Sequence, residues 1–94
     1  MNIFELGEVV ATNGVERIIK EDVFAYYECL ECLNRHESGD WVDLCEEDKQ
    51  VNENALLYGG RVMSAYTIGK NKDKIWIITE WDRSVTTILL PEEY

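Results

Sequence analysis

The sequence predicts an α+β fold: helices in the N-terminal two thirds pack on one face of a three- or four-stranded antiparallel sheet that ends in a β-meander. Hydrophobic residues recur at helical spacing up to residue 60 and alternate with a period of two afterwards. Short turns separate the later strands, as is typical of antiparallel neighbours. A chain of 94 residues builds a single core. We therefore expect one domain, 1–94, with 1–60 mainly helical and acidic and 61–94 forming the meander.

The first part of the chain predicts one short strand and two helices. Residues 7–12 form the strand. Asn13 and Glu16 have the spacing of a capping box, which predicts a helix over 13–20. A second helix is expected over 22–36. Its predicted buried stripe repeats at three- and four-residue spacing and consists of Val23, Tyr26, Tyr27, Leu30 and Leu33.

The rest of the chain predicts a third helix and the meander. A helix over 46–58 begins with three acidic residues, which suit the positive end of the helix dipole, and ends at Gly59. Alternating side chains then predict strands over 62–68, 74–80 and 85–90, joined by tight turns.

Each of the three tryptophans has an expected place. Trp41 is expected in the core beside the end of the second helix. Trp76 should lie on the face of the central strand opposite Ile75 and Ile77, because successive side chains of a strand point to opposite faces. Core packing is expected for Trp81, and an exposed position at an interface is the alternative.

The negative charge lies almost entirely in the helical part. The net charge is −10; residues 1–60 hold 14 acidic and 4 basic side chains, and residues 61–94 hold 5 of each. Direct binding to nucleic acid or to an anionic membrane is disfavoured, since both would repel this chain. An acidic surface suits a basic protein groove, with a purely solubilising role as the alternative.

Nothing in the sequence predicts membrane insertion or secretion. No stretch reaches the roughly 20 apolar residues that a transmembrane helix needs. The N-terminus lacks the basic start and apolar run of a secretory signal, and three cysteines argue against a disulfide framework. We expect a cytoplasmic protein whose oligomeric state the sequence leaves open.

All the cysteines and the only histidine fall within seventeen residues, as Cys29, Cys32, His36 and Cys45. Three sulfur ligands and one nitrogen suit tetrahedral zinc. At about 100° per residue, the first three share one strip of the second helix, apart from the predicted apolar stripe. The prediction is one structural zinc, since four protein ligands leave no open position; buried cysteines with a surface histidine are the alternative.

The sequence gives little support to catalysis. A Cys–His nucleophile pair would need His36 free of metal and a third group to orient it, and no such group is evident. We expect that the protein is not an enzyme, and a small hydrolase is the weakest of the alternatives.

Two segments carry a resemblance to a known group of proteins. They are Gly39-Asp40-Trp41-Val42-Asp43-Leu44 and the tail from Ile75 to Tyr94. Together with the Gly7–Thr12 opening, they resemble a small-protein family carried on plasmids, phages and integrative elements. That setting resembles the setting of counter-defence genes, including anti-CRISPR inhibitors of Cas9.

The resemblance and the charge together predict a stoichiometric inhibitor that blocks nucleic-acid loading on a Cas9-type effector. The acidic side chains expected to act as phosphate surrogates are Glu21, Asp22, Glu28, Glu31, Glu46, Glu47, Asp48 and Glu53. The alternative is a zinc-stabilised adaptor or regulator of plasmid or phage biology that binds another host protein.

Overall fold

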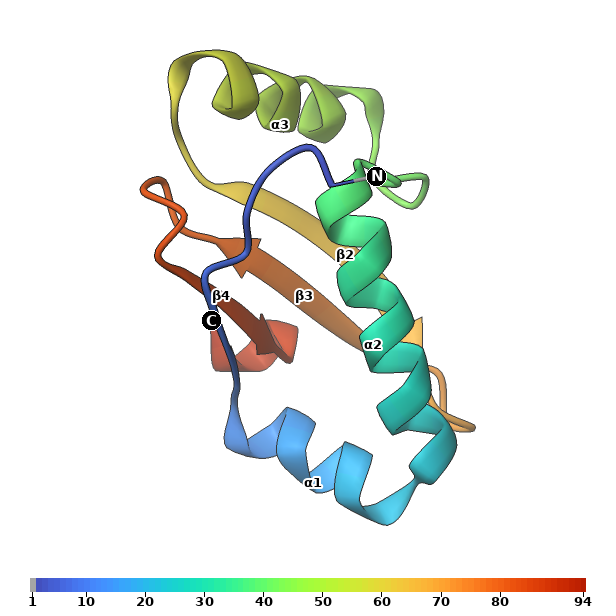
Figure 1. Ribbon diagram of the computed structural model, residues 1–94. Coiled ribbons are helices and arrows are strands. Elements are labelled where there is room, and N and C mark those ends of the chain that lie inside the picture. Colours follow the sequence, from blue (N-terminus) through green and yellow to red (C-terminus); the bar gives the residue numbers. More distant parts are fainter. Residues whose placement is uncertain (1) are drawn as a thin grey trace.

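The computed structural model describes residues 2–94 and confirms the α+β class (Figure 1). Three helices precede most of the sheet, and a short 3-10 turn ends the chain. In chain order the elements are β1 (Glu8–Ala11), α1 (Asn13–Glu21), α2 (Val23–Ser38), α3 (Glu46–Tyr58), β2 (Val62–Ile68), β3 (Asp73–Thr79), β4 (Val85–Leu89) and η1 (Pro91–Glu93).

The sheet is mixed, and the expectation of a purely antiparallel sheet is wrong. Its strand order is β1-β4-β3-β2, and β2, β3 and β4 form the predicted antiparallel meander. The first strand, β1, pairs in parallel with β4, from Glu8 opposite Val85 to Ala11 opposite Ile88. Parallel strands need a long crossover. The helices and strands between β1 and β4 provide it.

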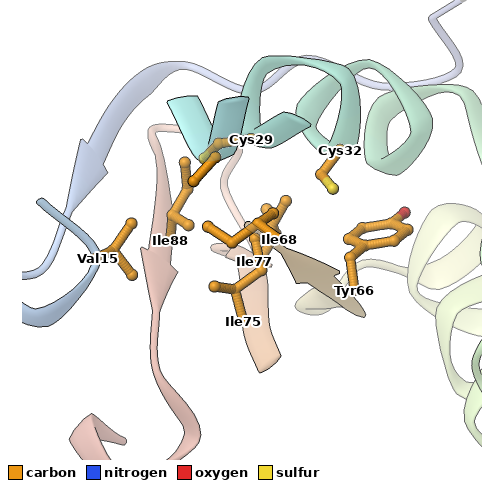
Figure 2. Close-up of a cluster of buried hydrophobic side chains, with 9 residues drawn as sticks. Val15, Cys29, Cys32, Tyr66, Ile68, Ile75, Ile77 and Ile88 are labelled. Carbon is orange, nitrogen blue, oxygen red and sulfur yellow. The ribbon is translucent and has the colours of Figure 1, made fainter. Parts of the chain in front are cut away.

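The core lies between one face of the sheet and the helices. Buried isoleucines and Tyr66 from the strands meet small side chains from the helices, and Figure 2 shows Cys29 and Cys32 pointing from α2 toward them. The complete cluster is Val15, Ala25, Cys29, Cys32, Tyr66, Ile68, Ile75, Ile77 and Ile88. A second cluster of Trp41, Ala55 and Val62 joins α3 to the start of β2.

The predicted buried stripe of α2 faces the solvent instead. Val23, Tyr26, Tyr27 and Leu30 are exposed, and Leu33 is only partly buried. The buried residues of this helix are Ala25, Cys29, Cys32 and His36, which we call the sheet-facing side of α2. The side chains of Ala25, Cys29 and Cys32 are small, so the helix can lie close against strands that already supply bulky isoleucines.

The first turn of α1 is capped from the far end of the chain. The predicted capping box at Asn13 is wrong, because Thr12 is the N-cap residue and no local side chain caps the helix. The Glu93 carboxylate instead accepts hydrogen bonds from the Thr12 hydroxyl and from the Gly14 main-chain N–H. These bonds lower the pKa of Glu93, the Thr12 hydroxyl most of all. The C-terminal turn therefore stabilises the start of α1.

The middle and the C-terminal end of α3 are held by hydrogen bonds to the sheet region. The Asn52 side chain donates to the Met63 carbonyl at 2.6 Å and accepts from the Met63 N–H at 3.0 Å, which pairs part of the β2 edge. Arg83 donates to the Ala55 carbonyl at 3.2 Å and to the Gly60 carbonyl at 2.6 Å. This guanidinium supplies the positive charge that the last turn of α3 lacks.

The tryptophans divide as expected except for one. Trp41 is buried and donates to the His36 carbonyl at 3.2 Å. Trp76 lies on the sheet face opposite the main core and contacts the ring of Tyr94. Trp81 is 69% exposed, so the expectation of core packing is wrong.

Among residues 2–94, no helix combines the length and hydropathy that a bilayer crossing requires. The longest of them, α2, has 16 residues.

Candidate functional site

The four predicted zinc ligands are not brought together in the described part of the chain. Cys29, Cys32 and His36 lie on the sheet-facing side of α2, whereas Cys45 is exposed at the N-cap of α3. Burial raises the pKa of Cys29 and raises that of Cys32 to about 12, which disfavours the thiolate that zinc requires. Within residues 2–94, no three His, Cys, Asp or Glu side chains are grouped to hold a metal ion.

His36 is the centre of a buried chain of hydrogen bonds. Its Nδ1 contacts the Ser64 hydroxyl, and its Nε2 lies 2.8 Å from the Thr79 hydroxyl. The Thr79 hydroxyl lies 2.7 Å from that of Thr86, which donates to the Leu6 carbonyl at 2.7 Å. All four side chains are fully buried. The chain links α2, three strands and the N-terminal segment.

The direction of each bond follows from proton counting. Thr86 gives its only hydroxyl proton to Leu6, so Thr79 must donate to Thr86 and must accept from His36 Nε2–H. Nε2 therefore carries a proton, and in a neutral ring Nδ1 carries none and accepts from the Ser64 hydroxyl. Burial, with a smaller effect from Arg83, lowers the pKa of His36 to about 4, in agreement with a neutral ring.

His36 holds the core together through these hydrogen bonds, and Cys29 and Cys32 pack in the main hydrophobic cluster. Neither ring nitrogen of His36 is free to bind a metal in this arrangement, so the residues do not fit a four-ligand site as they lie. Zinc binding stays a prediction of the sequence. It is checked by elemental analysis of untagged, freshly reduced protein, in which it requires about one zinc per chain. A zinc content near zero would remove it.

Two of the eight predicted acidic contact residues hold the turn between β2 and β3. Asp22 caps α2 by accepting from the Phe24 and Ala25 N–H groups, and its second oxygen accepts from Lys70 N–H at 3.2 Å. The bond from Lys70 contributes most to lowering the pKa of Asp22. Glu28 accepts from Gly69 N–H at 2.8 Å. Both carboxylates thus fix local structure and still carry charge at the surface.

The remaining predicted contact residues are exposed but do not share one surface. Glu21 ends α1, and Glu31 lies on α2. Glu46, Glu47, Asp48 and Glu53 lie on α3, and Lys49 pairs with Glu46 at 3.5 Å. In Figure 1, α3 lies at the end of the molecule opposite the junction of α1 and α2. The acidic residues therefore form two separate groups.

The outer side of α2 is exposed, although its spacing predicted that Val23, Tyr27 and Leu30 would be buried. Val23, Tyr27, Leu30 and Asn34 are all exposed, and we call them the outer stripe of α2. In Figure 1 this helix lies in front of the sheet, with no other described element over its outer side. The three- and four-residue spacing of these residues showed that they share one side of the helix, but it did not show that this side is exposed.

A groove runs beside the outer stripe, between α2 and the β2–β3 turn. It is open, has a volume of about 630 Å³ and is lined by two aromatic rings and three carboxylates. The lining residues are Asp22, Phe24, Tyr27, Glu28, Glu31, Gly69 and Lys70. Phe24 is 74% exposed and Tyr27 is 63% exposed. Large exposed apolar side chains beside charges are typical of protein-binding surfaces.

No protein-family model, curated protein or solved structure matches this chain. The resemblance to a mobile-element family therefore stays an expectation from the segments quoted above.

Proposed function

We propose that the protein acts by binding another protein stoichiometrically, as a counter-defence inhibitor that blocks nucleic-acid loading on a Cas9-type effector. The observation that supports this proposal is the exposed aromatic and acidic surface of α2. Phe24 and Tyr27 stand in the solvent beside the carboxylates of Glu28 and Glu31. The type of effector comes from the sequence resemblance alone.

The mechanism follows from the two kinds of side chain on this surface. Exposed aromatic rings lose water and pack when a partner covers them, and such residues contribute most of the affinity in many interfaces. The carboxylates attract a basic groove that is built for nucleic acid and raise the rate of encounter. An acidic domain seated in such a groove repels guide RNA or target DNA and occupies its place.

A titration of DNA cleavage by the effector tests the proposal. Purified protein is added before the guide RNA in one series and after it in another. We expect cleavage to stop near one inhibitor per effector, most effectively when the inhibitor is added first. Inhibition far below equimolar would indicate an enzyme. No inhibition, together with co-purification of a replication or transcription protein, would support the adaptor instead.

Matched charge reversals identify which acidic group makes contact. One variant carries Glu21→Lys and Glu31→Lys near α2, and the other carries Glu46→Lys and Glu47→Lys on α3. All four side chains are exposed. We expect the first variant to bind more slowly and with a weaker salt dependence, and the second to resemble the parent. The opposite result would move the contact surface to α3.

A further inference from the structure

The outer stripe of α2 has the spacing of a helix-pairing surface. Val23, Tyr27, Leu30 and Asn34 follow one another at intervals of four, three and four residues. This is the spacing of the two core positions in a heptad repeat. At about 100° per residue, the stripe lies opposite the sheet-facing side of α2. It points directly away from the sheet and is free to meet another helix.

The residues beside the outer stripe continue the same pattern. Phe24 and Glu31 occupy one flanking row, and Tyr26 and Leu33 occupy the other. Phe24 and Tyr26 are exposed, and Leu33 is partly buried. Charged residues in such flanking rows select the partner helix and its orientation. Here the only charge in the flanking rows is the carboxylate of Glu31.

The charges around the groove favour a basic partner. Asp22, Glu28 and Glu31 line it together with the single lysine, Lys70. The Lys70 N–H bond to Asp22 keeps the pKa of that carboxyl low, so its charge persists near neutral pH. A second copy of this chain carries the same three carboxylates beside its outer stripe and a net charge of −10 overall. Like charges at an interface disfavour that pairing.

We infer that the outer stripe and the adjoining groove bind one amphipathic helix of the partner, with leucine-like side chains on its inner seam and lysine or arginine along its flanks. This inference rests on the proposed function and specifies the part of the partner that α2 contacts. The seam of the partner helix packs on Val23, Tyr27 and Leu30, and its basic flank reaches Glu28 and Glu31.

Labelled synthetic peptides provide the probe. The test peptide has three heptads, with leucine at both seam positions and lysine at the flanking positions. A second peptide has the same composition in scrambled order, and a third has glutamate in place of lysine. Binding to the full chain is measured by fluorescence anisotropy. We expect the test peptide to bind at least about tenfold more tightly than either control, and to gain helical circular dichroism on binding.

Two exposed substitutions examine the site. Tyr27→Ala and Leu30→Ala are each expected to weaken peptide binding about tenfold or more. Leu57→Ala is the matched control, because Leu57 is 74% exposed on α3 and lies outside the outer stripe. Equal binding of the scrambled peptide, or full binding by the Tyr27 and Leu30 variants, would overturn the inference.

The cleavage titration separates this inference from the proposed function. If Tyr27→Ala abolishes inhibition but the parent protein does not bind the test peptide, the surface contacts something other than a basic helix and the inference fails alone. If the peptide binds in a Tyr27-dependent way but the parent protein does not inhibit the effector, the inference holds and the proposed function fails.

Discussion

The two sides of α2 have the same spacing and opposite surroundings. Ala25, Cys29, Cys32 and His36 follow one another at intervals of four, three and four residues, and so do the members of the outer stripe. The first set is buried and the second is exposed. The larger and more apolar side chains are the exposed ones. Helical spacing therefore shows which residues share a side, and it does not show which side is covered.

The difference between the two sides of α2 comes from the side chains on the face of the sheet that the helix covers. The strands supply bulky isoleucines together with the hydroxyls of Ser64, Thr79 and Thr86 on one face. Small thiols fit against the isoleucines, and an imidazole can bond the hydroxyls. A leucine in the place of His36 would remove the imidazole that Ser64 and Thr79 contact, and a buried hydroxyl left without its partner costs about 1–3 kcal/mol.

The largest effect is expected from His36→Ala. The substitution removes the imidazole at the centre of the buried hydrogen-bonded chain, so Ser64 and Thr79 each lose a hydrogen bond, and a cavity opens where the ring was. We expect a loss of about 3–5 kcal/mol in the free energy of unfolding, measured by urea denaturation. A loss below about 1 kcal/mol would contradict the role assigned to this side of α2.

Acid is expected to weaken the fold through the same residue. The pKa of His36 is 6.5 in an ordinary environment and about 4 in the fold. Between pH 6.5 and about 4, His36 is protonated in the unfolded chain but stays neutral in the folded chain. The contribution of the neutral His36 to the free energy of unfolding is therefore fully present above pH 6.5. It falls by about 3 kcal/mol as the pH drops to about 4.

The pH dependence is measured by urea denaturation at a series of pH values, with His36→Gln as the control. Glutamine carries no titrating ring, so most of the change between these two pH values should disappear in that variant. An equal change in parent and variant would assign the acid sensitivity to carboxylates, three of which (Asp22, Asp82 and Glu93) have lowered pKa values.

A smaller effect is expected from Cys32→Ser, which places a hydroxyl against the Tyr66 region of the core. We expect a loss of about 1–2 kcal/mol, seen as a lower melting temperature, because the hydroxyl loses water on burial. Cys32→Ala should cost less, since it adds no polar group. If both variants lose the same large amount, and the parent contains zinc, Cys32 is a metal ligand and the comparison between the two sides of α2 fails.

The smallest effect on stability is expected on the outer stripe. Tyr27→Ala and Leu30→Ala should each change the free energy of unfolding by less than about 0.5 kcal/mol, because these side chains are exposed in the free protein. The same variants should lose partner binding. A destabilisation above about 1 kcal/mol would mean that the outer stripe supports the fold of the isolated chain.

The local elements were the most predictable part of this protein. The helix predicted over 46–58 has those bounds in the structure, and the meander strands differ from their predicted ranges by no more than one residue at either end. Acidic first turns, glycine stops and alternating side chains act over a few residues, so they can be recognised without the rest of the chain.

The candidate site was predictable only in part. The acidic residues of α2 and α3 were recognised, but their separation into two groups depends on where the chain places α3. Tyr27, one of the two aromatic residues that line the groove, was predicted to be buried. Four cysteine and histidine side chains predicted a metal site, but Cys29 and Cys32 lie in the main hydrophobic cluster and His36 lies in the buried chain of hydrogen bonds.

The sequence alone determined the class of the fold, the order of its elements and the concentration of negative charge in the helical part. The tertiary structure decided which side of α2 is covered, how β1 pairs with β4 and how Glu93 caps α1. The physical reason is the range of the interactions. Periodicity and turn chemistry arise between neighbours in the chain, whereas burial and buried hydrogen bonds depend on partners that are distant in sequence.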